Sequence, residues 1–341
     1  MSDAKIKIFF EERRKVLKSN RFNVMALAGA LILAVPLGAF AQSADYAAEV
    51  LTKGAGARPL AMGGAFVAAA TDATAAYWNP AGLALIDDIE ITTMHSAQSD
   101  LQSYDFLNIA FKTDSAGSYA LSYLRLGVGD IQLTNASSPI PFGVTSYSDQ
   151  AALISGGWKL GKQFALGATI KLLKTDAASA SAFGFGSDLG LIFKPMKELA
   201  FGLTARDYTG GSYIQWQGTS TNPTQVLQPS VTVGVSWTEE LGKRQAQGDA
   251  PVPVSTLSVN FDADTLYAGK ALNNYHFGVE YWYKQFVAVR GGFETKGFQF
   301  DNDSFTPSAG VGVWAYLFEI DYAFVANSIG GIHYISLITR L

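Results

Sequence analysis

Apolar residues alternate with small or polar ones in short segments from about residue 89 to the C-terminus, and this pattern limits the fold more than any other feature of the sequence. A period of two residues predicts β-strands that have one apolar face. The clearest segments are residues 163–174, 198–207, 228–238, 274–284 and 318–324, and weaker ones are residues 89–97, 104–113, 117–126, 149–160, 184–195, 254–263, 286–296, 306–316 and 332–341. The sequence therefore predicts about fourteen strands, an even number.

The alternation alone does not separate a soluble β-sandwich from a transmembrane barrel, because strands of both have one apolar face. The connections favour the barrel. Short turns follow the even-numbered predicted strands, and longer polar loops follow many odd-numbered ones, at residues 127–148, 175–183, 208–227, 264–273 and 297–305. This asymmetry is typical of bacterial outer-membrane barrels. An even number of strands then places both termini on the periplasmic rim, together with a polar insertion at residues 239–253.

The composition agrees with a sheet that faces lipid. Charged residues make up 16 % of the chain, against about 25 % in soluble proteins. Beyond the N-terminal region, no run reaches the roughly 18 apolar residues of a membrane-spanning helix, so strands must carry a membrane role. The net charge of −4 over 341 residues gives no sign of a nucleic-acid binder. Aromatic residues are candidates for girdles at the two membrane interfaces: Tyr275, Tyr281, Trp282, Tyr283, Trp314 and Tyr316.

Residues 1–41 have the pattern of a secretory signal peptide. Basic residues are frequent in 5–21, and residues 24–39 are apolar and uncharged. Pro36 breaks this run before it reaches the roughly 20 residues that a spanning helix needs, and Ala39-Phe40-Ala41 is a small-x-small cleavage site. An uncleaved anchor helix is the alternative. The sequence thus predicts secretion to the bacterial outer membrane.

A stretch rich in small residues, 54–83, precedes the first predicted strand. It contains Gly63-Gly64-Ala65-Phe66, the pair Asp72-Ala73, and Tyr77-Trp78-Asn79-Pro80-Ala81-Gly82-Leu83. This order of motifs closely resembles the N-terminal segment of the FadL-like (OMPP1/FadL/TodX) barrels, and more closely that of their PorV/PorQ branch. The resemblance implies an all-β fold: a transmembrane antiparallel β-barrel of about fourteen strands with an N-terminal plug, or hatch, in its lumen. The implied domains are a signal peptide at 1–41, a plug at 42–88 and a barrel at 89–341.

The motif Asn79-Pro80-Ala81-Gly82 combines residues that suit a tight turn. Pro80 fixes its own φ and biases Asn79 away from the helical region, and Gly82 permits a close approach of the backbone. A plug must thread its backbone through a crowded lumen, which favours glycine and alanine. The candidate plug residues are Gly63, Gly64, Asn79, Pro80, Ala81 and Gly82. The alternative is that they only shape a turn and contact no ligand.

Several charged residues fall in the alternate sets that are predicted to face the lumen: Lys171, Arg206, Glu280, Arg290, Glu294, Glu319 and Asp321. Their signs are mixed, without the excess that would indicate an ion-selective porin. We expect these residues to pair with one another and with the plug, because an unpaired buried charge is costly.

The sequence contains no pattern that indicates an enzyme. Cysteine is absent, which excludes thiolate metal sites and cysteine nucleophiles. None of the three histidines, His95, His276 and His333, has a partner at metal-ligand spacing, and no G-x-S-x-G motif occurs. A scattered triad, as in an outer-membrane hydrolase, stays open from sequence. We expect no catalytic residue, no metal and no cofactor.

Two functions from different classes remain. The PorV/PorQ resemblance and the short mature length, residues 42–341, favour a component of type IX secretion that engages secreted cargo proteins, attachment machinery or secretion-system subunits. The alternative is a FadL-like passive transporter of long-chain fatty acids or other hydrophobic compounds across the outer membrane. Aromatic residues in the predicted long loops are candidates to contact a protein partner or a hydrophobic ligand: Phe142, Tyr147, Tyr208, Tyr213 and Trp216.

Overall fold

The structure is a computed structural model. It describes residues 47–99, 101–113, 117–135, 138–207, 212–219, 221–227, 229–242, 254–266, 273–297, 299, 304–327 and 330–341. The predicted signal peptide and Tyr208 lie outside this part of the chain, so the cleavage site stays a prediction. Within the described residues, no helix is both long enough and apolar enough to cross a membrane.

Strands dominate the described part of the chain, where sixteen of them join one antiparallel sheet. They are β1 (Glu90–Ala97), β2 (Gln102–Thr113), β3 (Gly117–Asn135), β4 (Ser138–Leu160), β5 (Phe164–Ala177), β6 (Ala180–Phe193), β7 (Leu199–Arg206), β8 (Tyr213–Gln217), β9 (Thr224–Val226), β10 (Ser230–Leu241), β11 (Ser255–Leu266), β12 (Asn273–Tyr283), β13 (Val287–Lys296), β14 (Phe305–Ala315), β15 (Phe318–Asn327) and β16 (Gly330–Arg340).

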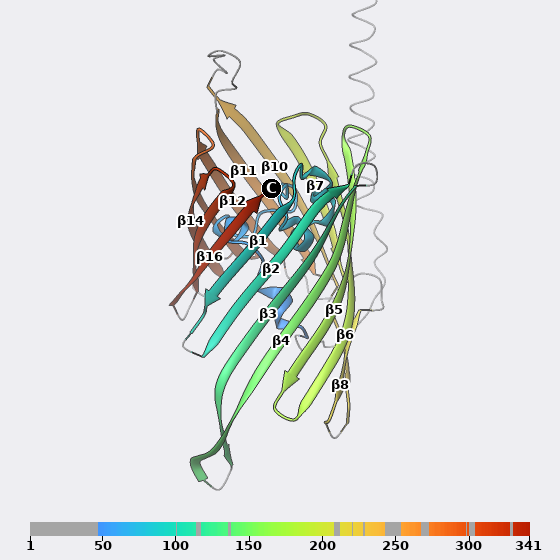
Figure 1. Cartoon of the computed structure of the whole chain (residues 1–341), viewed down its shortest axis with the longest axis vertical. Helices are drawn as coiled ribbons and strands as arrows, with labels where there is room; N and C mark the ends of the chain where they lie inside the picture. The colour runs from blue at the N-terminus through green and yellow to red at the C-terminus, as the bar shows by residue number, and fades with distance from the viewer. Residues whose placement is uncertain are drawn as a thin grey trace, which may run out of the picture. The chain divides into compact units, whose positions relative to one another are not determined.

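The sheet closes on itself. β1 pairs with β16, and β5 pairs with β6, so neither end of the sheet is free. The strands β1 to β7 and β10 to β16 form a closed barrel of fourteen, which confirms the predicted number (Figure 1). The short strands β8 and β9 form a hairpin, and β8 pairs with β6 beyond the point where β7 ends.

Side chains alternate between the outside and the inside of the barrel. In β5, Leu166, Ile170 and Leu172 are exposed, whereas Thr169 and Lys171 are buried. Large apolar residues are exposed in the same way on strands around the barrel, for example Leu107, Leu121, Ile154, Leu189, Val289, Ile320 and Ile335. The outer surface is therefore an apolar band of the kind that lipid requires. On β1 to β5, one row of polar residues paired in register borders this band: His95, Asp105, Arg125, Gln150 and Lys174.

Three of the predicted long loops are wrong. Residues 127–148 continue β3 and β4 as a hairpin, which carries a register shift between Val128 and Ile131. Most of residues 175–183 belong to strands, because β5 and β6 stay paired as far as Ala177 and Ala180, and only a short turn joins them. Residues 208–227 contain β8 and β9. The alternation missed these extensions because a strand that projects past the lipid no longer needs one apolar face.

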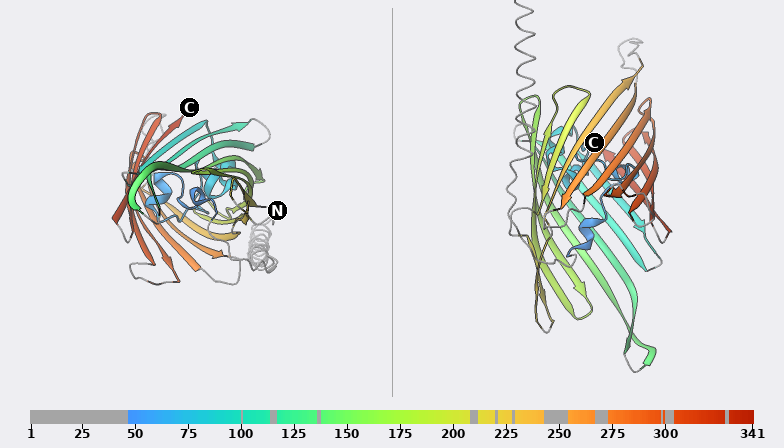
Figure 2. Two further views of the ribbon diagram at one scale, coloured as in Figure 1. Left: turned by 90° about the horizontal axis from the view of Figure 1, so that it is seen from below. Right: turned by 180° about the vertical axis from the view of Figure 1, so that it is seen from behind.

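The N-terminal segment, residues 47–88, lies inside the barrel. Its short helical elements are η1 (Glu49–Thr52), α2 (Ala57–Ala61), α3 (Ala75–Trp78) and η2 (Pro80–Leu85). Seen along the barrel, these elements, drawn in blue, lie within the ring of strands (Figure 2). Most side chains of the segment are buried, and those of Met62, Phe66 and Leu83 are fully buried. The segment and the inward-facing wall residues thus share one core.

Candidate functional site

Hydrogen bonds from strands all around the barrel hold the N-terminal segment. The segment's backbone N–H groups donate to Ser336 Oγ of β16 (Ala57, 2.8 Å), Ser308 Oγ of β14 (Gly63, 2.9 Å), Asp262 Oδ2 of β11 (Phe66 and Val67, both 2.7 Å) and Glu90 Oε2 of β1 (Ala73, 2.7 Å). Such side-chain acceptors satisfy donors that the short helical turns leave without intrahelical partners. The wall is therefore built to receive this backbone, and sequence reasoning did not identify Asp262 or these serines.

Glycines on the inner face of the wall let the segment approach closely. A Cβ at Gly167 of β5 would lie 2.1 Å from Pro80 C, one at Gly202 of β7 would lie 2.5 Å from Val67 O, and one at Gly292 of β13 would lie 2.3 Å from Met62 C. The same holds, at under 3.0 Å, for Gly157, Gly190, Gly278 and Gly310. Any other residue at these positions would push the segment off the wall. The small members of the alternating sets thus mark the path of the segment.

Asn79, a candidate plug residue, is fully buried and acts as a backbone cross-link. Its Nδ2 donates to Val67 O at 2.8 Å and to Leu191 O of β6 at 3.2 Å, and its Oδ1 accepts from Ala81 N at 3.1 Å. The residue is extended, with φ −156° and ψ 104°, as the following Pro80 requires. Pro80 then opens η2, where its missing N–H is not needed. The motif joins two turns of the segment to one wall strand.

Gly63 and Gly64, the other candidate plug glycines, have positive φ values of 63° and 79°. A Cβ at Gly63 would lie 2.5 Å from Phe293 O of β13. The carbonyl oxygen of Gly63 lies 2.7 Å from His276 Nδ1, and His276 Nε2 lies 3.2 Å from Asp264 Oδ2. The left-handed turn and the tight contact both require glycine here. His276 therefore contacts both the segment and the wall residue Asp264.

A buried network of charges joins the segment to the wall on the side of the C-terminus. Arg58 of α2 pairs with Asp72 at 2.8 Å and with Glu280 of β12 at 2.7 Å. Glu280 also pairs with Arg290 of β13 at 2.6 Å, and Arg290 contacts Asp321 of β15. Each of these carboxylates is almost fully buried, so the pairing compensates a large desolvation cost.

The network continues to the seam between the first and last strands. Arg340 of β16 pairs with Glu90 of β1 at 2.9 Å and with Glu319 of β15 at 3.0 Å, and Arg290 reaches Glu319 at 3.2 Å. Sequence reasoning assigned Glu280, Arg290, Glu319 and Asp321 to the lumen but missed Arg58, Asp72, Glu90 and Arg340. Glu90 and Arg340 belong to the alternate sets of β1 and β16 that contain the buried residues, so alternation could have predicted that both face the lumen.

Two tryptophans that were predicted to lie in interfacial girdles face the lumen instead. Trp282 is 7 % exposed, and the Arg290 guanidinium lies 5.2 Å from its ring centroid. The Arg340 guanidinium lies 4.0 Å from the ring of Trp314. The girdle prediction is wrong for this pair because buried guanidinium groups take aromatic faces as additional partners. Tyr283 and Tyr316 are exposed, as a girdle requires.

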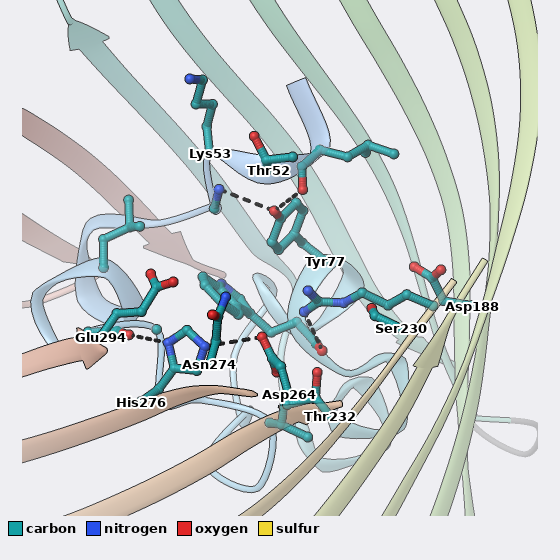
Figure 3. Close-up of a pocket in the computed structure, with 18 of the residues that line it drawn as sticks. Thr52, Lys53, Tyr77, Asp188, Ser230, Thr232, Asp264, Asn274, His276 and Glu294 are labelled. Carbon is teal, nitrogen blue, oxygen red and sulfur yellow. Dashed lines mark hydrogen bonds and ion pairs between the residues drawn. The ribbon is translucent and has the colours of Figure 1, made fainter. Parts of the chain in front are cut away.

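A cavity of about 560 Å³ lies in the lumen against the other side of the segment (Figure 3). Its wall residues include Lys296 at the end of β13, Asn274 near the start of β12 and Ser230 at the start of β10, so it lies toward the rim opposite the C-terminus. Tyr77 and Trp78 of α3 form part of its floor. The cavity is lined by several other apolar residues and by charged residues of both signs.

Three of the predicted lumen charges, Lys171, Arg206 and Glu294, line this cavity. Lys171 pairs with Asp188 at 2.7 Å and with Asp207 at 2.6 Å. All seven predicted lumen charges therefore lie inside the barrel, but the structure divides them between the network near the C-terminus and the cavity on the other side of the segment.

The described residues offer no group of three or more His, Cys, Asp or Glu side chains that could hold a metal ion. His95 and His333 contact Asp105 Oδ1 and the Tyr322 hydroxyl on the outer face, both at 2.7 Å. The lumen residues instead offer hydrogen bonds, charge and a floor of aromatic rings.

No protein-family model and no curated protein matches the chain in sequence. Among solved structures, the chain is similar to the toluene transporter TbuX of Ralstonia pickettii, with a TM-score of 0.54 and 13 % identity over 85 % of this chain and 99 % of the transporter. Two structures of the toluene transporter TodX of Pseudomonas putida have TM-scores of 0.54 and 0.55 at 13 % and 12 % identity, over 85 % and 84 % of this chain and 99 % and 96 % of the transporter. The monoaromatic hydrocarbon channel CymD has a TM-score of 0.57 at 12 % identity, over 86 % of this chain and 99 % of the channel. At such low identity the likeness concerns the fold alone: this chain has the β-barrel fold of these transporters and channels.

Proposed function

We propose that this protein is an outer-membrane channel that lets hydrophobic small molecules pass the membrane passively, with residues 47–88 as its plug. One observation carries the proposal: the lumen of a closed barrel holds both a folded N-terminal segment and, beside it, a cavity of about 560 Å³. That volume lies within the roughly 300–1,000 Å³ of small-molecule sites. The toluene transporters and the hydrocarbon channel of the same fold support the choice of ligand class.

The orientation in the membrane is part of the proposal. Ile89 and Leu341 exchange two backbone hydrogen bonds, of 3.3 and 2.9 Å, so the residue that follows the plug and the C-terminus lie on one rim. Apart from the connection between β10 and β11, the turns on this rim are short, whereas β3 and β4 project from the other. Short turns are the periplasmic pattern of such barrels. The C-terminus is then periplasmic, and the cavity lies on the outer side of the plug. A periplasmic N-terminus stays a prediction, because residues 1–46 lie outside the described part of the chain.

Passage requires the plug to shift, because its residues cross the lumen and are mostly buried. The contacts between plug and wall are mainly single hydrogen bonds and ion pairs rather than strand pairing. Ligand in the cavity would touch Leu51, Leu60, Tyr77 and Trp78, all from the plug. Binding can therefore change the free energy of the closed plug relative to an open one.

The role in type IX secretion, with cargo proteins or secretion-system subunits as partners, stays a prediction from the resemblance of the motif to the PorV/PorQ branch. Phe142, one of the residues considered for such contacts, is 66 % exposed on the projecting part of β4. No feature of the lumen favours this role over transport.

Uptake of radiolabelled toluene tests the proposed function. Cells of a bacterium that lacks barrels of this fold would express the full chain, and the initial rate at low toluene concentration would be compared with that of the empty vector. We expect a severalfold faster uptake of toluene and unchanged uptake of arabinose, a hydrophilic control. Equal toluene rates with and without the protein in the outer membrane would contradict the proposal.

A further inference from the structure

The cations that line the cavity differ in what they contact. Lys171 has two carboxylate partners, Asp188 and Asp207. His276 contacts Asp264 and the carbonyl oxygen of Gly63. Arg206 of β7, in contrast, forms no ion pair with any residue that the structure describes, and its one hydrogen bond runs from Nη2 to the carbonyl oxygen of Trp78 at 3.3 Å.

Arg206 is held in place although it lacks an acidic partner. Its guanidinium lies 5.5 Å from the ring centroid of Tyr77 and 5.8 Å from that of Trp78. Its Nε is buried without a hydrogen-bond partner, and its Nη1 donates to no described residue. A guanidinium carries five N–H donors in a planar fork, so most of this donor capacity is unused. The two rings orient the fork beside the cavity.

The surroundings of Arg206 combine this unused donor group with apolar surface. The Tyr77 and Trp78 rings, Leu227, Val325 and Tyr334 line the same cavity. A neutral hydrocarbon that fills the cavity would remove water from the guanidinium and give it no acceptor, which is unfavourable. A carboxylate can accept two parallel N–H bonds from the fork, and such charge-assisted bonds are among the strongest in proteins.

From this geometry we infer that the cavity binds a small aromatic carboxylate, with its carboxylate on Arg206 and its ring against Tyr77, Trp78 and the apolar wall. The inference rests on the proposed function and specifies which hydrophobic small molecules bind most tightly, namely aromatic compounds that carry a carboxylate. The aromatic floor supplies stacking surface for a flat ring. Arg206 then determines specificity for the charged group.

Binding to the purified full-length protein in detergent tests the inference, with benzoate as the probe and benzamide as its neutral isostere. Isothermal titration calorimetry gives both affinities. We expect benzoate to bind at least tenfold more tightly than benzamide, since bonds to charged groups contribute about 1.5–3 kcal/mol and 1.4 kcal/mol is tenfold. Arg206→Gln should weaken benzoate binding about tenfold or more and leave benzamide binding unchanged, and Arg206→Lys should retain part of the affinity.

Lys162→Gln is the matched control. Lys162 is exposed between β4 and β5, outside the lining of the cavity, and the substitution removes the same unit of charge. We expect benzoate affinity within about twofold of the parent, because an exposed charge is screened by water. Folding of each variant is checked by its migration on gels with and without heating.

Benzoate affinity that is unchanged in a folded Arg206→Gln variant would overturn the inference, and so would equal affinity of the parent for benzoate and benzamide. The proposed function fails separately. Absence of toluene uptake by the parent protein would overturn the proposed channel function. The benzoate measurement in detergent does not depend on transport. Toluene uptake together with Arg206-independent benzoate binding would overturn the inference alone.

Discussion

Replacing Arg58 by methionine should release the N-terminal segment from the wall without disturbing the barrel. Arg58 binds Glu280 through Nε at 2.8 Å and Nη2 at 2.7 Å, and it binds Asp72 through Nη1 at 2.8 Å. Methionine keeps much of the side-chain volume but no donor. The closed state would then contain two buried carboxylates that have each lost a partner, whereas water reaches both groups once the segment leaves its place.

Arg58→Met should destabilise the closed position of the segment by an amount at the lower end of the range for a broken buried ion pair. Breaking such a pair typically costs about 3–5 kcal/mol. Glu280 keeps Arg290 Nε at 2.6 Å, and Asp72 keeps Thr74 N at 2.9 Å, so we expect about 3 kcal/mol. At 1.4 kcal/mol for each factor of ten, the open population should rise about a hundredfold.

Cysteine labelling measures this population directly, because the chain has no cysteine of its own. Ser155 of β4 lies under the segment, with its Oγ 3.4 Å from Ala76 O, and Ser155→Cys is nearly isosteric. The maleimide labelling rate of this reporter should rise about a hundredfold with Arg58→Met. Lys112→Met is the control: it breaks an exposed pair with Asp87 at 3.2 Å and should change the rate less than about threefold. An unchanged rate in Arg58→Met would refute the reasoning.

Three further predictions concern the wall and the motif. Gly167→Ala places a Cβ 2.1 Å from Pro80 C and should raise the Ser155→Cys labelling rate more than tenfold, whereas Gly291→Ala, with nothing within 4 Å, should not. Asn79→Leu removes the side-chain donor to the carbonyl groups of Val67 and Leu191 and should destabilise the closed position of the segment by about 1–3 kcal/mol. The Ser155→Cys labelling rate should then rise, while the barrel stays resistant to trypsin. Ile320→Lys, on the apolar outer band, should reduce the yield of folded barrel in lipid vesicles, at a cost of about 2–4 kcal/mol if the site is near mid-membrane, and normal yield would argue against lipid contact there.

The strands could be predicted from sequence because lipid outside and a packed lumen inside impose opposite demands on successive residues. All fourteen predicted strands overlap strands of the closed barrel, β5 and β10 among them. Where that constraint ends, the prediction failed: the projecting parts of β3 and β4 were taken for a loop. Trp282 shows the reverse error, since its residue type suggested a girdle although its alternate set placed it inward beside Glu280.

The candidate site could be predicted only residue by residue. Alternation assigned Arg290 and Glu319 to the lumen, but the identity of their partners depends on the closure of β1 against β16 and on the path of the segment. Arg58 precedes Glu280 by 222 residues, and no local pattern links them. The lack of an acidic partner for Arg206 depends on Lys171 taking both Asp188 and Asp207, which only the three-dimensional arrangement reveals.

A reversible cross-link between the N-terminal segment and the wall tests the proposed function most directly, because we propose that ligand passes through the lumen when the segment moves. Ala57 N lies 2.8 Å from Ser336 Oγ, so Ala57→Cys with Ser336→Cys can join α2 to β16 in a chain that has no other cysteine. The account predicts that oxidation lowers the rate of toluene uptake severalfold, that reduction restores it, and that the parent responds to neither treatment. Equal uptake by the cross-linked and the reduced protein would contradict it.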